Sequence, residues 1–315
     1  MKALITGGSG FIGSFLAEQI QLSSEVTVLD NLSTGTEENL RNVSNNVELI
    51  KGDIRDSNLI DSLIKNADVV FHLAAAVGVK NIINNPQESI STNIYGSENV
   101  LNSATKHNKR IIIASTSEIY GKSTKQPLSE TDDRLIGPPQ QFRWTYSDAK
   151  AIEEGIATYL YAVKKLKVTT VRFFNIVGPR QSSDYGMVLP TFVNNAVSNK
   201  PLLVHGDGQQ RRVFCHVKDA VKAFASIASN DDAIGEVFNV GGSSEISMLD
   251  LAELVKRLTN SNSEIRMISY KDVYPVGFED MQRRVPDLSK IKKSINWEPE
   301  FSIEKIILDI IGSIK

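Results

Sequence analysis

The sequence has little that would indicate an exported or membrane-bound protein. It contains one cysteine, Cys215, in 315 residues, so no internal disulfide and no cysteine-based zinc site is expected. We expect the Cys215 thiol to be a small buried apolar group rather than a reactive one. No apolar run approaches the roughly eighteen residues that span a bilayer, and no secretory leader is expected before the first predicted strand. These absences predict a cytoplasmic location.

The sequence also lacks an excess of basic residues. Its formal net charge is −2, whereas nucleic-acid or anionic-membrane partners favour a basic face. We therefore expect neither kind of partner, and any phosphate binding has to be local. No internal repeat or low-complexity segment is present. The length allows a large core and a second lobe.

The first thirty residues organise the chain. An apolar run at Lys2–Thr6 predicts a strand, a glycine loop follows, and an apolar-periodic segment to about Gln21 predicts a helix. A second strand ends on Asp30, whose carboxylate is suited to a ribose and would repel a 2′-phosphate. This order predicts an NAD site, with an ordinary glycine-rich turn as the alternative. The loop residues assigned to the cofactor are Gly7, Gly10, Phe11, Ile12 and Gly13.

Strands that alternate with helical patterns follow along the chain. Strands are predicted near residues 47–50, 68–73, 110–114 and 168–173, and helices near 59–64, 87–107 and 146–164. The pattern predicts an α/β protein with a Rossmann-type, doubly wound parallel sheet and a smaller C-terminal substrate-binding lobe. We assign residues 1–174 to the NAD-binding domain and residues 175–315 mainly to the nucleotide-sugar lobe, with about 235–245 returning to the main sheet.

Ligands bind beyond the carboxyl ends of the strands in such sheets, which adds further candidate residues. Asp53 follows the third strand and is placed near the adenine, and small residues after the fourth strand leave room for a cofactor. The full set of additional cofactor candidates is Asn31, Asp53, Ile54, Leu73, Ala74, Ala75 and Asn93.

Tyr146 and Lys150 are four residues apart at the start of a predicted helix, so both side chains lie on one helix face. A phenol has an ordinary pKa near 10, and an adjacent ammonium can lower that pKa toward the range in which the phenolate acts as a base. A solvated helix face is the alternative. Their position after the fifth strand, beyond the polar segment Ser115–Gly121, favours the catalytic interpretation.

Here the chain resembles the extended short-chain dehydrogenase/reductases, the group of nucleotide-sugar epimerases, dehydratases and decarboxylases. The resemblance covers nearly the whole chain. It rests on the glycine loop, Asp30, Asp53, the Tyr146/Lys150 pair, and Arg172-Phe173-Phe174-Asn175 leading to Gly178-Pro179-Arg180. The resemblance implies hydride removal from carbon 4 of a hexose by NAD, with Tyr146 and Lys150 also touching the cofactor. It adds Thr116, Ser117 and Glu118 to the catalytic candidates.

The residue type at Glu118 distinguishes the reactions that members of this group catalyse. Simple 4-epimerases of the group have a small or neutral residue here, whereas dehydratases have Asp-Glu where this chain has Ser117-Glu118. The chain is instead similar to UDP-glucuronate decarboxylases. That similarity includes Ile136-Gly137-Pro138 through Arg143-Trp144-x-Tyr146, Arg211-Arg212-x-Phe214, and Gly277-Phe278-Glu279-Asp280 through Arg284-x-Pro286. Glu118 would serve carbon 5, with a purely structural carboxylate as the alternative.

The same resemblance places Arg284 near the substrate carboxylate, with a diphosphate clamp as the alternative. Arg212 resembles the arginine that binds the diphosphate, for which a guanidinium fork is suited. Asn175 and Arg180 are further substrate-contact candidates. Arg143 is left out of the site, because beside Trp144 it is equally compatible with a stacked surface pair.

The sequence thus predicts an NAD-dependent enzyme that oxidises a UDP-sugar at carbon 4 and resembles a UDP-glucuronate decarboxylase. A 4-epimerase acting on UDP-glucose, UDP-GlcNAc or UDP-glucuronate is the alternative reaction. An NAD-binding regulatory protein is the non-enzyme alternative, and it would not need Tyr146 and Lys150. No metal is expected. The helices near 87–107 and 146–164 are where members of the group dimerise, so a homodimer is expected unless those faces pack only on the sheet.

Overall fold

The computed structural model describes residues 1–43, 46–78, 85–141, 144–183, 186–273 and 281–314. Its centre is a parallel sheet of seven strands in the order β11-β6-β5-β4-β1-β2-β3. The predicted doubly wound sheet is therefore confirmed. The strands are β1 Lys2–Thr6, β2 Glu25–Asp30, β3 Val47–Lys51, β4 Val69–His72, β5 Arg110–Thr116, β6 Lys167–Phe174 and β11 Val237–Gly241.

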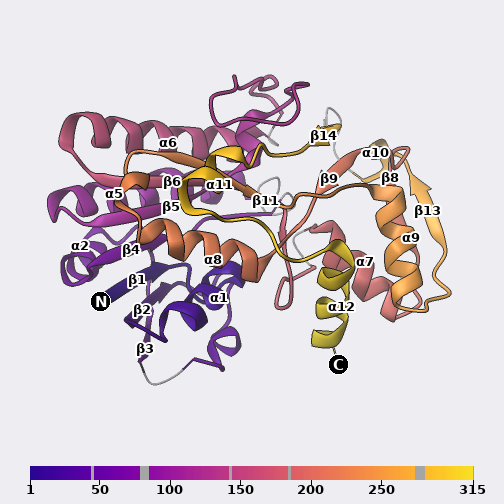
Figure 1. Ribbon diagram of the computed structural model, residues 1–315, viewed down its shortest axis with the longest axis horizontal. Coiled ribbons are helices and arrows are strands. Elements are labelled where there is room, and N and C mark those ends of the chain that lie inside the picture. Colours follow the sequence, from indigo (N-terminus) through magenta and orange to yellow (C-terminus); the bar gives the residue numbers. More distant parts are fainter. Residues whose placement is uncertain (44–45, 79–84, 142–143, 184–185, 274–280, 315) are drawn as a thin grey trace.

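Helices cover both faces of this sheet (Figure 1). One face packs on α1 Phe11–Ile20 and α8 Val217–Ala228, and the opposite face on α2 Ser57–Asn66, α5 Ser97–Lys106 and α6 Thr145–Lys164. Alternate strand residues supply the two cores. In β1, Ile5 faces α1 and α8, whereas Leu4 faces the other layer, as the two-residue period of a strand requires. A sheet buried on both faces explains the almost fully apolar strands.

The segment expected as one helix near 87–107 is interrupted. It consists of α4 Pro86–Ile90, a π-helical segment η2 Ser91–Gly96, and α5. The prediction of a single α-helix was wrong because hydrophobic periodicity does not reveal one widened turn. Asn93 lies in this turn and is fully buried. Gly96 fits there because a Cβ would lie 2.4 Å from Ile54 Cδ1.

The second lobe is smaller and lies beside the carboxyl edge of the sheet (Figure 1). Its helices α7, α9 and α12 pack in a separate core. Ser247 caps α9, since its hydroxyl accepts from the Asp250 N–H at 3.0 Å. The elements are α7 Val188–Val197, β8 Leu202–His205, β9 Arg211–Val213, β12 Glu245–Ser247, α9 Met248–Leu258, β13 Ile265–Ile268, α10 Tyr270–Val273, β14 Arg283–Arg284 and α12 Ile303–Ile314.

The two lobes are interleaved along the chain. β11 and α8 come from the second half of the sequence and complete the main sheet layer, and α11 Ser289–Ile295 packs beside them. Short connecting elements complete the fold: η1 Glu37–Leu40, η3 Ser117–Tyr120, β7 Ile176–Val177, β10 Cys215–His216 and η5 Asp231–Ala233. β9 pairs with both β12 and β14 in a separate three-stranded sheet of order β12-β9-β14.

Cys215 lies in β10 and is 1% exposed. Burial raises the pKa of its thiol well above the usual range, and the charge of Asp219 adds to this. Because the thiolate is the reactive form, we expect a disulfide reagent to modify native Cys215 at least about a hundredfold more slowly than the denatured chain. Timed thiol assays with and without denaturant check this. Equal rates would mean that the thiol is accessible in the fold.

Candidate functional site

The glycine loop follows β1 and lies against the neighbouring strand ends. Gly7 has a φ of +72°, and a Cβ there would lie 2.7 Å from the Ala74 backbone nitrogen. At Gly13 a Cβ would lie 2.2 Å from the Gly7 carbonyl oxygen. Both positions therefore require glycine, one for its backbone conformation and both for the close approach of two backbone segments.

The loop leads directly into the N-terminus of α1. Gly10 is the N-cap and gives no side-chain hydrogen bond, so N–H groups of the first turn remain available to an anion. Asp30 accepts from the Ser9 N–H at 2.9 Å and from the Leu32 N–H at 2.8 Å. Burial raises the pKa of this carboxyl group. A carboxylate has further lone pairs, so these residues fit the pyrophosphate and ribose of a dinucleotide.

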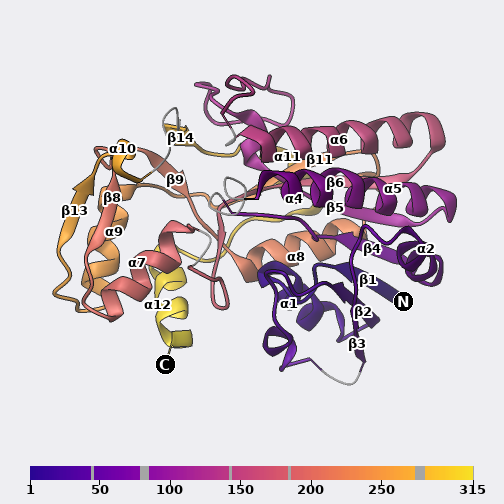
Figure 2. The same cartoon turned by 180° about the vertical axis from the view of Figure 1, so that it is seen from behind.

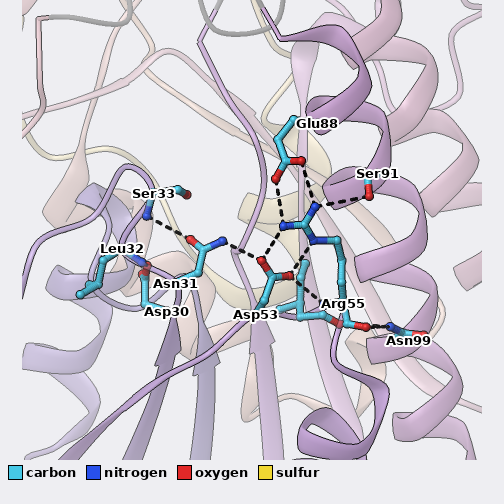
Figure 3. Close-up of polar contacts among 10 residues, drawn as sticks. Asp30, Asn31, Leu32, Ser33, Asp53, Arg55, Glu88, Ser91 and Asn99 are labelled. Atoms are coloured by element: carbon cyan, nitrogen blue, oxygen red, sulfur yellow. Dashed lines mark hydrogen bonds and ion pairs between the residues drawn. The ribbon is translucent and has the colours of Figure 1, made fainter.

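Asp53 follows β3, an edge strand of the main sheet, and belongs to a polar network there (Figure 3). Arg55 donates to both Asp53 oxygens, at 2.9 and 2.8 Å, and Asn31 donates to Oδ2 at 2.9 Å. Arg55 also pairs with Glu88 of α4 at 2.9 Å. The Arg55 hydrogen bonds hold the pKa of Asp53 well below its usual range. The sequence did not single out Arg55, which fixes the carboxylate expected near the adenine.

The small residues after β4 are held in place by Asn93. Its side-chain amide accepts from the Ala76 N–H at 2.8 Å and donates to the Ala76 carbonyl at 3.0 Å. Thr6 accepts from the Ala74 N–H at 3.3 Å. Asn93 thus positions the segment that includes Leu73, Ala74 and Ala75, which are all partly exposed. Ile54 is buried against Gly96 and belongs to the packing beneath this edge.

Tyr146 lies in the first turn of α6, opposite the end of β5. Burial raises the pKa of Tyr146, and the negative charges of Glu153 and Glu118 add to this. A hydrogen bond with the Thr116 side chain lowers the pKa by less, so the net shift is upward. Thr116 also accepts from the Glu118 N–H at 3.1 Å, and Ser117 is buried. The structure thus brings Tyr146 together with the polar segment after β5.

Lys150 lies one turn further along α6 and is 1% exposed. Its ammonium donates to Glu153 Oε2 at 2.7 Å. This partner was not identified from the sequence, although Glu153 is three residues further along the same helix and so shares its face. A third ionisable side chain, that of Glu153, therefore belongs with the expected Tyr146/Lys150 pair.

Glu118 meets the second lobe. Its carboxylate forms an ion pair with Arg284 of β14, whose guanidinium also bonds the Asn175 side chain. Asn175 in turn donates to the Val213 carbonyl at 2.8 Å. The side chains of Glu118 and Arg284 are 19% and 11% exposed. Three of the predicted catalytic and substrate residues therefore form one cluster between the lobes, close to the Thr116 segment.

Two further predicted substrate contacts lie elsewhere. Arg212 is buried on β9, and its guanidinium donates to the Arg211 carbonyl at 2.9 Å. Arg180 contacts α1: it donates to Ser14 at 3.2 Å and pairs with Glu18 at 2.5 Å. In this structure Arg180 ties the second lobe to the cofactor lobe, and its substrate role stays a prediction. Arg143 and the motif Gly277–Asp280 lie outside the described residues.

Comparison with known proteins gives the family. A family model described as GDP-mannose 4,6 dehydratase matches residues 4–310. The chain belongs to the extended short-chain dehydrogenase/reductases. Within this family of NAD-dependent nucleotide-sugar epimerases and dehydratases, curated members have names that match the predicted class of reaction, so the chain is an enzyme rather than a binding protein.

Three similar proteins illustrate the range of the family. UDP-N-acetyl-alpha-D-glucosaminuronate decarboxylase of Bacillus cytotoxicus is 42% identical over 98% of this chain and 96% of its own length. UDP-glucuronic acid decarboxylase 1 of Arabidopsis thaliana is 34% identical over 97% of this chain and 68% of its own length. The solved structure of UDP-glucose 4-epimerase from Thermus thermophilus in complex with NAD is 25% identical, with a TM-score of 0.85 over 99% of this chain and 98% of that one.

One buried pair beneath the site was missed by the sequence reasoning. Glu154 bonds Arg172 of β6 at 2.7 Å and Ser115 of β5 at 2.5 Å. Arg172 also donates to the Tyr120 hydroxyl at 2.8 Å. The spacing of Glu154 from Lys150 along the helix gave no signal for this pair, because the partners of Glu154 come from β5 and β6. This pair ties α6 to the sheet and so fixes the helix that carries Tyr146 in this extended short-chain dehydrogenase/reductase.

In the part of the chain that the structure describes, no group of three or more histidine, cysteine, aspartate or glutamate side chains is arranged to hold a metal ion. No helix in the same ranges is long and apolar enough to cross a membrane.

Proposed function

We propose that this chain is an NAD-dependent UDP-hexuronate decarboxylase. UDP-N-acetylglucosaminuronate and UDP-glucuronate are the candidate substrates, because the relatives at 42% and 34% identity are named for decarboxylation of these uronates. NAD rather than NADP is favoured by Asp30, whose charge would repel a 2′-phosphate. The glycine loop and the uncapped start of α1 suit its pyrophosphate.

The cluster of Glu118, Arg284 and Asn175 carries the proposal. It lies beside Thr116, which hydrogen-bonds the proposed base Tyr146. A guanidinium fork is suited to a carboxylate, and an arginine in this place supplies the positive charge that a hexuronate requires. A neutral hexose offers no carboxylate to this arginine.

The chemistry needs few groups. Tyr146 accepts the proton of the 4-hydroxyl. NAD, which the glycine loop and Asp30 would hold, would supply the acceptor for the carbon 4 hydride and the donor that restores it. The 4-ketone makes the substrate a β-keto acid. When the bond between carbon 5 and the carboxylate breaks, CO₂ leaves and the electron pair of that bond stays on the sugar as an enolate. Arg284 orients the carboxylate before this step, and Glu118 is the acidic group beside carbon 5 for reprotonation.

Incubation of the purified protein with NAD and each uronate tests the proposal. We expect the UDP-sugar to lose the mass of CO₂, with the N-acetylated uronate turned over at least as fast as UDP-glucuronate. UDP-glucose is the matched control, because it has the same ring but no carboxylate to lose.

A 4-epimerase is the second candidate reaction. It is favoured by the similarity to the solved 4-epimerase structure and by chemistry, because a glutamate near carbon 5 does not prevent the ketone from turning and being reduced on its other face. An isomer of unchanged mass, formed from any of the three sugars without CO₂ release, would establish this alternative. Arg284 would then be a diphosphate clamp.

The proposal includes a homodimer formed by α4, η2 and α6, which lie side by side on one flank (Figure 2). Exposed apolar side chains gather there: Ile90, Tyr95, Ile152, Tyr159 and Val163 are 38–60% exposed. On α6 their spacing places Ile152, Tyr159 and Val163 in one stripe. A second copy of this surface is the occupant that covers it.

Charging this stripe is expected to break the dimer. Tyr159→Asp removes an apolar contact from both copies and should weaken association by at least about a hundredfold. Light scattering over a concentration series measures the change. Leu308→Asp is the control, because Leu308 is 51% exposed on α12, away from this flank. A monomeric wild-type protein at all concentrations would contradict the dimer.

The cytoplasm is the proposed location. The single cysteine of the sequence fits a reducing compartment.

A further inference from the structure

Glu153 is a buried ionisable group that the proposed mechanism does not use. It lies on α6, and its side chain is 1% exposed. Its Oε2 accepts from the Lys150 ammonium at 2.7 Å, and the Lys150 side chain is 2% exposed. Water therefore does little to weaken the interaction between the two charges. The lysine beside the proposed base already has an internal counter-ion.

The groups that face Glu153 come from several elements. His72 of β4 lies 3.8 Å from Oε1, and its ring is hydrogen-bonded to Ser97 of α5 at 2.9 Å. Burial lowers the pKa of His72 to about 3, so its ring is neutral and adds no positive charge. Glu154, from the same helix, adds a negative charge. Lys150 is the cation that faces Glu153 among the described residues.

The Glu153 carboxyl group is incompletely satisfied. Within the described part of the chain, its Oε1 is buried and has no hydrogen-bond partner. Burial also raises the pKa of the group. A buried ion pair that served stability alone would be expected to have its remaining lone pairs bonded. Leaving this oxygen unbonded costs free energy. Because the oxygen belongs to the partner of a proposed catalytic lysine, the cost points to a functional role for Glu153.

We propose that Glu153 is a positioning residue that neutralises Lys150 and thereby sets the pH above which Tyr146 acts as a base. This inference rests on the role of Tyr146 in the proposed function. Whichever member of the Lys150–Glu153 pair holds the shared proton, the pair carries no net charge. Lys150 then does not stabilise the phenolate of Tyr146 by a full positive charge, and the tyrosine keeps its proton to a higher pH.

The direction of this effect follows from the charges near the phenol. Burial has the largest upward effect on the pKa of Tyr146. The negative charge of Glu153 raises this pKa next, by more than the charge of Glu118 does. The base works when deprotonated, so activity is lost as the pH falls through the pKa of Tyr146. Removing the Glu153 charge leaves the Lys150 ammonium uncompensated, lowers that pKa and moves the acid limb of the profile to lower pH.

Glu153→Gln tests this by the pH dependence of kcat. We expect the acid-limb midpoint to fall by about 1–3 units. Glu153→Asp keeps the charge and should keep a midpoint close to the wild-type value. Asp148→Asn is the matched control, because it removes the same charge from α6 at a side chain that is 49% exposed. An unchanged or raised midpoint in Glu153→Gln would overturn the inference.

A second titration uses no substrate. The tyrosinate absorbance of the protein, after subtraction of the Tyr146→Phe titration, reports Tyr146 alone. Glu153→Gln should shift this difference titration downward by the same amount as the kcat limb. If the acid limb of kcat shifts but the tyrosinate difference titration does not, the effect belongs to a group other than Tyr146.

The pairing itself has a stability readout in case Glu153→Gln alone does not fold. Lys150→Met leaves Glu153 buried without its cation and should lower the Tm by several degrees. Adding Glu153→Gln to that variant should recover most of the loss. A double variant no more stable than Lys150→Met would mean that the two groups are not coupled.

These outcomes separate the inference from the function on which it rests. Full activity in Tyr146→Phe would remove the proposed base and the proposed mechanism with it. An inactive Tyr146→Phe together with an unshifted Glu153→Gln profile would reject the role of Glu153 alone.

Discussion

Tyr146→Phe is expected to lower kcat by about 100-fold to 10,000-fold, the usual contribution of a positioned acid–base group. The phenol is the group that hydrogen-bonds Thr116 at the start of α6, and phenylalanine keeps the ring but removes the proton-accepting oxygen. NAD affinity should stay within a few-fold of the wild-type value, because the glycine loop and Asp30 are untouched. Steady-state kinetics with a UDP-hexuronate and NAD titration by calorimetry measure the two quantities.

Tyr159→Phe is the control for this change. It removes the same hydroxyl from the same helix at a side chain that is 56% exposed. Because Tyr159 lies in the proposed dimer stripe, the light scattering of this variant is measured too and should match that of the wild-type protein. Tyr161→Phe, at a side chain of the same helix that is 39% exposed and outside the stripe, is the second control, and turnover should be unaltered in both. Loss of NAD binding in Tyr146→Phe would mean that the substitution disturbs the cofactor site. Unchanged turnover would mean that another group takes the proton.

Arg284→Gln is expected to reduce decarboxylation of a UDP-hexuronate by at least about 30-fold. Removing one partner of a buried charge pair costs about 2–5 kcal/mol, and each 1.36 kcal/mol is about tenfold in rate. Here the change leaves Glu118 without its cation and the substrate carboxylate without its fork. Release of CO₂ under single-turnover conditions measures the step directly.

The neighbouring residue supplies a matched control. Arg283 lies beside Arg284 on β14, but its side chain is 51% exposed and pairs with Glu245 at 2.7 Å. Exposed pairs contribute little, so Arg283→Gln should leave CO₂ release nearly unchanged. Competition by UDP separates the roles of Arg284. If Arg284→Gln weakens the binding of UDP as strongly as it weakens the binding of the uronate, the arginine binds the diphosphate rather than the carboxylate.

Much of the fold was predictable because its signals are local. The apolar strands and the glycine loop each depend on a few adjacent residues, and the structure has them where the sequence places them. The widened turn at Ser91–Gly96 was not predicted, since one extra residue in a turn leaves the hydrophobic pattern nearly intact. The family follows from the same local motifs, and the match over residues 4–310 agrees with it.

The sequence by itself determined the doubly wound sheet, the dinucleotide loop, and Tyr146 with Lys150 on one helix face, because each is set by periodicity or by spacing within one element. Only the tertiary structure decided which side chains meet. Glu118 bonds Arg284, 166 residues away in the chain, and Asp53 is held by Arg55, which also reaches Glu88 of another helix. Even Glu153, near Lys150 in sequence, owes its role to burial under helices and strands from elsewhere, because in water the same pair would be screened and weak.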